Sequence, residues 1–129
     1  MMIVAGLGCR KGCSAEDVMS ALDAACAEAR ISRISITALA TGEIKREEAG
    51  IIELAEKLGL PLHIVDDEAL LEAEPRTRTV SRHSIAKTLS SSLSEAAALA
   101  VAGEHSEIIV ARLISNGATC ALAEMKEVG

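Results

Sequence analysis

The stretch Met2-Ile-Val-Ala-Gly-Leu-Gly8, with the residues that follow it up to Ser14, decides the fold. A short apolar run that ends in glycines is typical of a strand buried on both faces of a sheet. The pattern Ser14-x-x-Asp17 then fits a capping box, and apolar residues recur at helical spacing from there to residue 30. A buried strand that leads directly into an amphipathic helix is the opening unit of an α/β fold.

Downstream of this unit, strand and helix patterns continue to alternate. We expect further strands at 34–40, 61–65, 108–114 and 119–123, and further helices at 45–58, 67–73 and 95–102. The turn signal Ser115-Asn116-Gly117 makes the last two strands a hairpin. The order predicts one domain over 1–129, a three-layer α/β/α sandwich. Its mostly parallel sheet of about five strands carries a C-terminal antiparallel hairpin strand at one end.

The composition argues against several classes of partner. A formal net charge of −6 speaks against nucleic acid, because phosphate binding needs a basic surface, and the absence of Phe, Tyr and Trp removes base-stacking platforms. No apolar run approaches the ~20 residues that cross a bilayer, and the start of the chain lacks the pattern of a signal peptide. We therefore expect a cytoplasmic protein with no membrane partner, whose four cysteines are reduced thiols.

The acidity is uneven along the chain. Residues 75–94 contain no Asp or Glu but carry Arg76, Arg78, Arg82 and Lys87. This basic stretch is the least regular part of the sequence, and it could serve an anionic ligand. A solvated basic loop fits the same pattern, so charge alone leaves both interpretations open.

Ligands of open α/β sheets bind beyond the carboxyl ends of the strands, where we expect the loops 8–14 and 41–48 and the basic stretch to converge. The first loop combines glycines, the cations Arg10 and Lys11, and the Ser14 hydroxyl at a helix N-terminus. Unpaired N–H groups there favour a carboxylate or a phosphate. The glycine spacing is one residue longer than the dinucleotide fingerprint, and a plain glycine turn with no ligand is the alternative.

Other chemistries have weaker support. Cys9 and Cys13 with three scattered histidines make a poor zinc pattern, so we expect no metal and no cofactor. Cys9 beside two cations could be a reactive thiol or simply a small buried hydrophobe. No Ser/His/Asp triad can be assembled, and the cluster Glu43, Glu47 and Glu48 could supply a general acid or base or form a solvated helix start. We assign no catalytic residue.

Several segments follow one another in an order that is more specific than any one of them. The first loop fits Gly-x-Gly-Cys-Arg-x-Gly-x-Ser at Gly6, Gly8, Cys9, Arg10, Gly12 and Ser14. The second fits Ala-Thr-x-Asp-x-Lys-x-Asp-Glu-Pro-Gly at Ala40, Thr41, Lys45, Glu48 and Gly50, with Glu43 and Glu47 for Asp and Ala49 for Pro. The step Leu58-Gly-Leu-Pro-Leu62 and the helix start Ser94-Glu-Ala-Ala-Ala-Leu99 complete the series.

In these segments the chain resembles the cobalamin-biosynthesis family of the CbiG C-terminal domain and the stand-alone CobE proteins. The final hairpin departs from the family, which has Lys-x-Lys-Ser-Gly where this chain has Arg112-Leu-Ile-Ser-Asn-Gly117. Of these residues, only Arg112 could replace a family lysine in charge.

The resemblance implies a role in building the corrin ring of vitamin B12. Two-domain CbiG proteins open a lactone on a cobalt-precorrin and release acetaldehyde, but this chain has no room for their N-terminal domain and is similar to the CobE type. The leading hypothesis is a protein that binds or carries a corrinoid or precorrin intermediate. The alternatives are a hydrolase that acts on a precorrin lactone or side chain, and a subunit that binds other enzymes of the pathway instead of a ligand.

The candidate ligand-binding residues come from four segments, of which the first three are expected at the carboxyl edge of the sheet and the fourth is the final hairpin. They are Gly8, Cys9, Arg10, Lys11, Gly12 and Ser14, then Thr41, Lys45 and Glu48, then Arg78 and Arg82, and finally Ser115 and Gly117.

Overall fold

The fold was determined as a computed structural model, which describes residues 2–9, 12–43, 47–73, 93–103 and 105–125. A five-stranded sheet forms its middle layer, in the strand order β3-β2-β1-β5-β4. The strands are β1 (Ile3–Cys9), β2 (Ile36–Gly42), β3 (Leu62–Val65), β4 (Ser106–Ser115) and β5 (Ala118–Met125).

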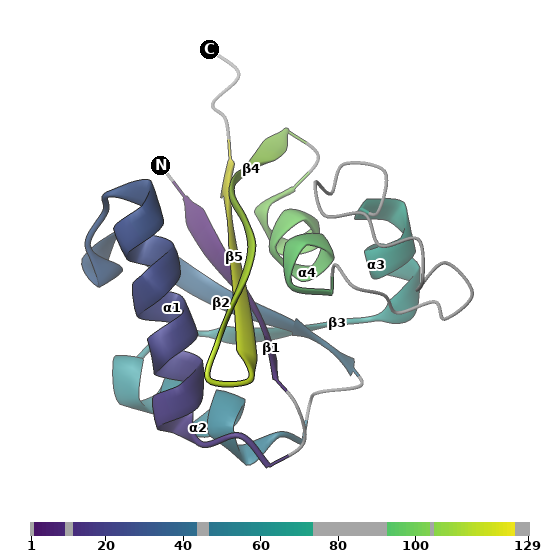
Figure 1. Cartoon of the computed structure of the whole chain (residues 1–129). Helices are drawn as coiled ribbons and strands as arrows, with labels where there is room; N and C mark the ends of the chain where they lie inside the picture. The colour runs from purple at the N-terminus through teal and green to yellow at the C-terminus, as the bar shows by residue number, and fades with distance from the viewer. Residues whose placement is uncertain (1, 10–11, 44–46, 74–92, 104, 126–129) are drawn as a thin grey trace.

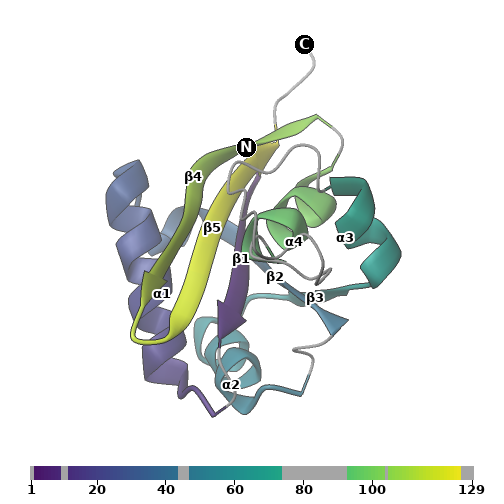
Figure 2. The ribbon, with the colours of Figure 1, turned by 45° about the vertical axis from the view of Figure 1, so that its right-hand side comes forward.

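Helices cover both faces of this sheet (Figures 1 and 2). One face packs against α1 (Ala15–Ala29) and α2 (Ala49–Leu58), and the other packs against α3 (Asp67–Ala73) and α4 (Leu93–Ala102). The expected three-layer α/β/α architecture is confirmed. In the described part of the chain, no helix is long and apolar enough to cross a membrane.

Strand direction agrees with a mostly parallel sheet, because β1, β2, β3 and β4 all run the same way. The antiparallel strand is not at one end of the sheet, as expected, but lies inside it. β5 pairs with both β1 and β4 and leaves β4 at the edge. Burial explains this order, since β5 is buried without interruption from Cys120 to Ala123, whereas β4 exposes Glu107, Ala111 and Ile114.

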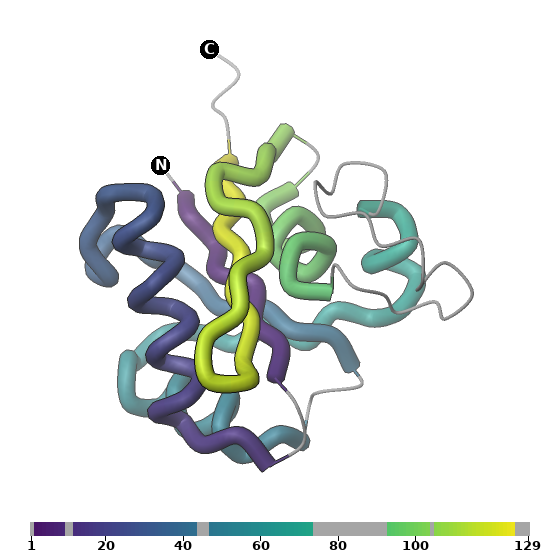
Figure 3. The backbone as a smooth tube through the Cα atoms, in the orientation of Figure 1, coloured from purple at the N-terminus to yellow at the C-terminus, as the bar shows by residue number. Residues whose placement is uncertain are grey.

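Local signals placed α1 and the hairpin turn correctly. The amide of Asp17 donates to Ser14 Oγ (3.1 Å) and the amide of Ser14 donates to Asp17 Oδ2 (3.2 Å), which completes the capping box. Asn116 and Gly117 have φ values of 52° and 82°, as the centre of a two-residue hairpin turn requires. Figure 3 follows the chain from β4 through this turn into β5.

Among the element boundaries that differ from the sequence-based expectation, two have a clear local cause. β2 begins at Ile36 instead of residue 34, because Arg33–Ser35 form a 3-10 turn in which Ile34 is 89% exposed. A β-branched residue was therefore mistaken for the start of a buried strand. Similarly, α2 begins at Ala49 instead of residue 45, because Glu48 has an extended backbone, with φ −72° and ψ 109°.

Candidate functional site

Three of the predicted segments meet at the carboxyl edge of the sheet. The amide of Gly12 donates to Glu48 Oε1 (3.4 Å), which joins the first loop to the start of α2. The thiol of Cys13 lies 3.6 Å from the carbonyl oxygen of Gly117, which joins the same loop to the hairpin turn. The start of α1, the start of α2 and the hairpin turn lie together at this end of the molecule (Figure 2).

The hairpin is fixed to α1 by a second contact. The hydroxyl oxygens of Ser20 and Ser115 lie 2.7 Å apart and share a hydrogen bond between α1 and the end of β4. The predicted residues Gly12, Ser14, Glu48, Ser115 and Gly117 therefore belong to one neighbourhood, built from three separate segments.

The remaining predicted residues fall into two groups. Gly8 and Cys9 lie within β1, and Thr41 lies within β2, fully buried, where its hydroxyl donates to the carbonyl oxygen of Leu7 (2.7 Å). Their ligand-binding roles stay predictions. Outside the described residues lie the predicted cations of the site, which are Arg10, Lys11, Lys45, Arg78 and Arg82.

The α1 N-terminus already has carboxylates of its own as partners. Asp17 closes the capping box on Ser14, and Glu48 accepts from the amide of Gly12. An anion that approaches this loop must therefore compete with Glu48 for the Gly12 amide and tolerate two nearby acidic side chains. This competition was not foreseen from the sequence, because Glu48 and Gly12 are 36 residues apart.

A second polar group lies on the α4 face of the sheet, and sequence reasoning missed it as a site. We call Ser94, Glu95, Arg112 and Thr119 the α4 cluster. Ser94 Oγ and Thr119 Oγ1 are 2.6 Å apart, and the amide of Arg112 donates to Glu95 Oε2 (2.9 Å). Both Ser94 and Glu95 are fully buried. The sequence placed the start of this helix at Ser94, but α4 begins at Leu93, so Ser94 lies within its first turn.

The glycines of β1 allow α4 to lie this close to the sheet. A Cβ added at Gly6 would lie 1.8 Å from the carbonyl oxygen of Ser94. A Cβ at Gly8 would lie 2.7 Å from Thr119 Oγ1 and 3.3 Å from Ser94 Oγ. The Gly-x-Gly pattern of the first strand thus has a packing reason, since a larger residue at either position would displace the α4 cluster.

The four cysteines are all buried thiols. Burial raises the pKa of Cys26 and Cys120 above the ordinary value of 9.0, and for Cys26 the nearby Asp23 carboxylate adds to the rise. Neither is therefore an activated nucleophile. Among the described residues, no group of three or more His, Cys, Asp and Glu side chains is placed to hold a metal ion.

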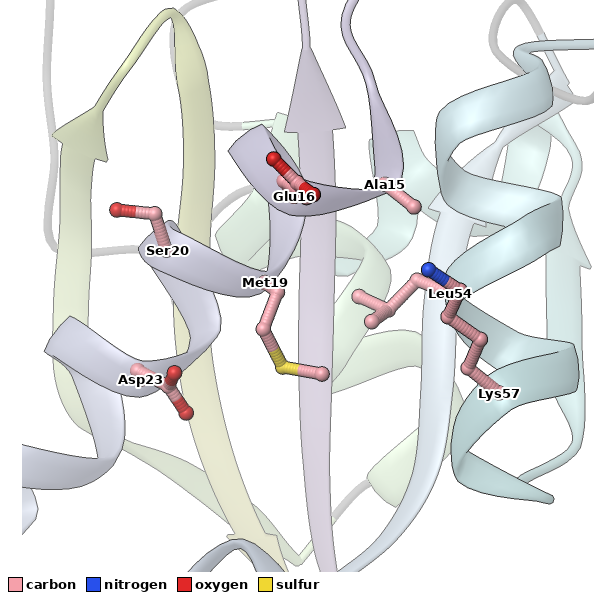
Figure 4. A pocket seen from close by; sticks show the side chains of 7 residues that line it. All are labelled: Ala15, Glu16, Met19, Ser20, Asp23, Leu54 and Lys57. Carbon is pink, nitrogen blue, oxygen red and sulfur yellow. The ribbon is translucent and has the colours of Figure 1, made fainter.

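A depression of about 370 Å³ lies between α1 and α2, on the opposite face of the sheet from α4 (Figure 4). Its floor is apolar, with Met19 and the fully buried Leu54, and its rim mixes acidic side chains with Lys57. The lining residues are Ala15, Glu16, Met19, Ser20, Asp23, Leu54 and Lys57. None of the predicted site residues lines this depression.

Comparison with known proteins places this architecture in a family. The chain matches the family described as Cobalamin synthesis G C-terminus over residues 3–123. It belongs to this family. Protein CobE of Sinorhizobium sp is 34% identical over 122 residues, which cover 94% of this chain and 79% of that protein.

The chain is also similar to a protein of known structure and to part of an enzyme. The crystal structure of CobE, a protein from the cobalamin (vitamin B12) biosynthetic pathway, has a TM-score of 0.87 at 36% identity. The match covers 97% of this chain and 91% of that chain. Cobalt-precorrin-5A hydrolase of Priestia megaterium is 36% identical over 58 residues, which are 45% of this chain but 16% of that enzyme. The family resemblance is confirmed, and the chain is a cobalamin-biosynthesis protein of this family.

Proposed function

We propose that the chain binds a corrinoid or precorrin intermediate of cobalamin biosynthesis and holds it at the carboxyl edge of the sheet. The observation that carries this proposal is the meeting of the first loop, Glu48 and the hairpin turn at that edge. This is where open α/β sheets bind their ligands. The family supplies the chemistry of the ligand, because its members belong to the pathway that builds the corrin ring.

The chemistry of the candidate residues suits such a ligand. A corrin intermediate has an apolar ring with carboxylates at its periphery, so its recognition needs donors and cations around an apolar surface. Glycine amides, the Ser14 hydroxyl and the cations Arg10, Lys11, Arg78 and Arg82 provide such groups in the sequence.

Hydrolysis of a precorrin lactone or side chain is the second candidate function. It is favoured by the 36% identity, over 58 residues, to the cobalt-precorrin-5A hydrolase. The matched 58 residues cover only 16% of that enzyme, so binding without turnover remains the leading proposal.

Expression of the chain together with the enzymes of the pathway distinguishes these functions. The visible spectrum of the purified protein reports a bound pigment. Stoichiometric pigment that is released unchanged supports the binding protein, and a pigment of altered mass supports the hydrolase. Co-purification of another pathway enzyme with no pigment contradicts both functions and indicates an interaction subunit.

A further inference from the structure

The α4 cluster is organised around a bulge in the edge strand. In the pairing of β4 with β5, Val110 is opposite Leu122 and Leu113 is opposite Cys120, so β4 has one residue more than its partner between these pairs. Arg112 lies in this irregular step. Bulges of this kind re-aim a side chain and are frequent beside binding sites.

Glu95 holds the bulge in place. Its carboxylate accepts the amide hydrogen of Arg112 at 2.9 Å from the first turn of α4. Glu95 is fully buried, so the carboxylate end of this bond is shielded from water, and the bond fixes the backbone of Arg112 relative to the helix.

The Arg112 side chain has a buried hydrogen-bond donor. Its Nε is removed from solvent and has no hydrogen-bond partner in the part of the chain that the structure describes. A buried N–H group without an acceptor is costly, so a ligand that supplied an acceptor to the Arg112 Nε would remove this cost.

A second hydrogen-bond donor lies on the first turn of α4, next to Glu95. Ser94 and Thr119 share one hydrogen bond at 2.6 Å, and because each hydroxyl has one proton, the pair retains one proton to donate elsewhere. Ser94 and Glu95 are consecutive, so the hydroxyl pair and Arg112 are both tied to the first turn of α4. A guanidinium N–H and a hydroxyl donor that are held by the same helical turn are suited to a carboxylate.

We propose that Arg112 binds a peripheral carboxylate of the ligand and that Glu95 is its positioning residue. This inference rests on the proposed function, since the carboxylate belongs to the bound corrinoid. The inference assigns carboxylate recognition to the α4 face of the sheet at its carboxyl edge. Arg112 lies in the hairpin segment in which this chain departs from the Lys-x-Lys-Ser-Gly pattern of the family.

Two corrinoid probes test the inference by absorbance titration. Cobyrinic acid carries free carboxylates at its periphery, whereas cobalamin carries amides at most of the same positions. Arg112→Gln keeps the backbone amide that bonds to Glu95 and removes the charge. It should weaken cobyrinic acid binding about ten-fold to a hundred-fold, with little change for cobalamin. Arg112→Lys should retain part of the preference for the acid, because it restores the charge but not the planar donor pair.

Arg33→Gln is the matched control, since it removes an exposed arginine that pairs with Asp23 on α1. Equal cobyrinic acid affinities for Arg112→Gln and Arg33→Gln would overturn the inference and leave the proposed function intact. Failure of the parent protein to bind either probe would reject both. A fold defect in Arg112→Gln would weaken both probes alike, and the Arg112→Lys variant then decides.

The role of Glu95 is tested by a double-mutant cycle. Glu95→Ala should lower the preference for cobyrinic acid over cobalamin, and adding Arg112→Gln should cause little further loss, because both changes act through the same guanidinium. Additive losses in the preference would show that Glu95 does not position Arg112.

Discussion

The carbonyl oxygen of Ser94 lies where a side chain on Gly6 would have to be, 1.8 Å from the position of an added Cβ. This contact joins the first strand to the first turn of α4 through backbone atoms. It sets how closely the helix packs on the sheet, and with it the position of Glu95 and of the hydroxyl pair that Ser94 forms with Thr119.

Gly6→Ala should therefore destabilise the protein strongly. Because the obstacle is backbone, α4 must move as a unit, and we expect a loss of about 3 kcal/mol or more in the free energy of unfolding. Gly8→Ala is the matched comparison, since its nearest neighbours are the side-chain oxygens of Thr119 and Ser94, which can rotate away. It should lose only about 1 kcal/mol. Urea denaturation measures both, and equal losses would contradict the packing argument.

Glu48→Gln should strengthen binding of a carboxylate-bearing ligand at the first loop. The native carboxylate accepts from the Gly12 amide and places a negative charge near the N-terminus of α1. Its neutralisation should tighten cobyrinic acid binding about two-fold to five-fold at low salt. Glu53→Gln is the control, because Glu53 is an exposed α2 residue paired with Lys57. Weaker binding in Glu48→Gln would mean that Glu48 contacts the ligand instead of competing with it.

The thiols of Cys26 and Cys120 should resist alkylation in the folded protein. Burial raises the pKa of both above 9.0, so less of each is in the reactive thiolate form than in a free cysteine. Iodoacetamide labelling at pH 8 followed by mass spectrometry should leave both unmodified and should label all four cysteines in urea. Rapid native labelling of Cys120 would contradict its burial.

The same pKa shifts predict how stability depends on alkaline pH. Above about pH 9 the unfolded chain loses thiol protons that the folded protein keeps, so the free energy of unfolding should fall as pH rises. The chain has no tyrosine, which leaves lysine as the main other side chain that titrates there. Cys120→Ala should reduce the alkaline slope, and an unchanged slope would show that the thiol does not contribute to it.

Local sequence patterns predicted what local contacts determine. The Ser14 and Asp17 capping box spans three residues, and the turn at Asn116 and Gly117 needs only its own backbone angles, so both were predicted correctly. The order of the strands was predicted less well. The residues of β5 and its turn do not by themselves indicate that β5 pairs with β1. In the structure, β5 is buried continuously whereas β4 alternates between buried and exposed residues, which is why β5 lies inside the sheet.

The α4 cluster could not be predicted for the same reason. Ser94 meets Thr119 across 25 residues, and Glu95 meets Arg112 across 17, and both pairings depend on the register of the hairpin in the sheet. In the sequence, Ser94-Glu95 was indistinguishable from an ordinary helix start. A useful signal was the Gly-x-Gly of β1, because glycines inside a buried strand indicate close approach of another backbone as well as a ligand loop.

Neutralisation of Arg78 and Arg82 should separate a ligand-binding basic stretch from a solvated one. If these cations act on several carboxylates of the ligand, affinity for cobyrinic acid should fall as salt rises, because charges are screened over ~8 Å at physiological ionic strength. The double variant Arg78→Ala/Arg82→Ala should then bind more weakly and show a flatter dependence on salt than the parent. Dissociation constants at low and high salt measure both effects, with Arg33→Gln as the control for loss of a remote positive charge. Superimposable curves for the parent and the double variant would exclude both arginines from the site. The first loop and Arg112 would then remain as the candidate groups for the ligand's carboxylates.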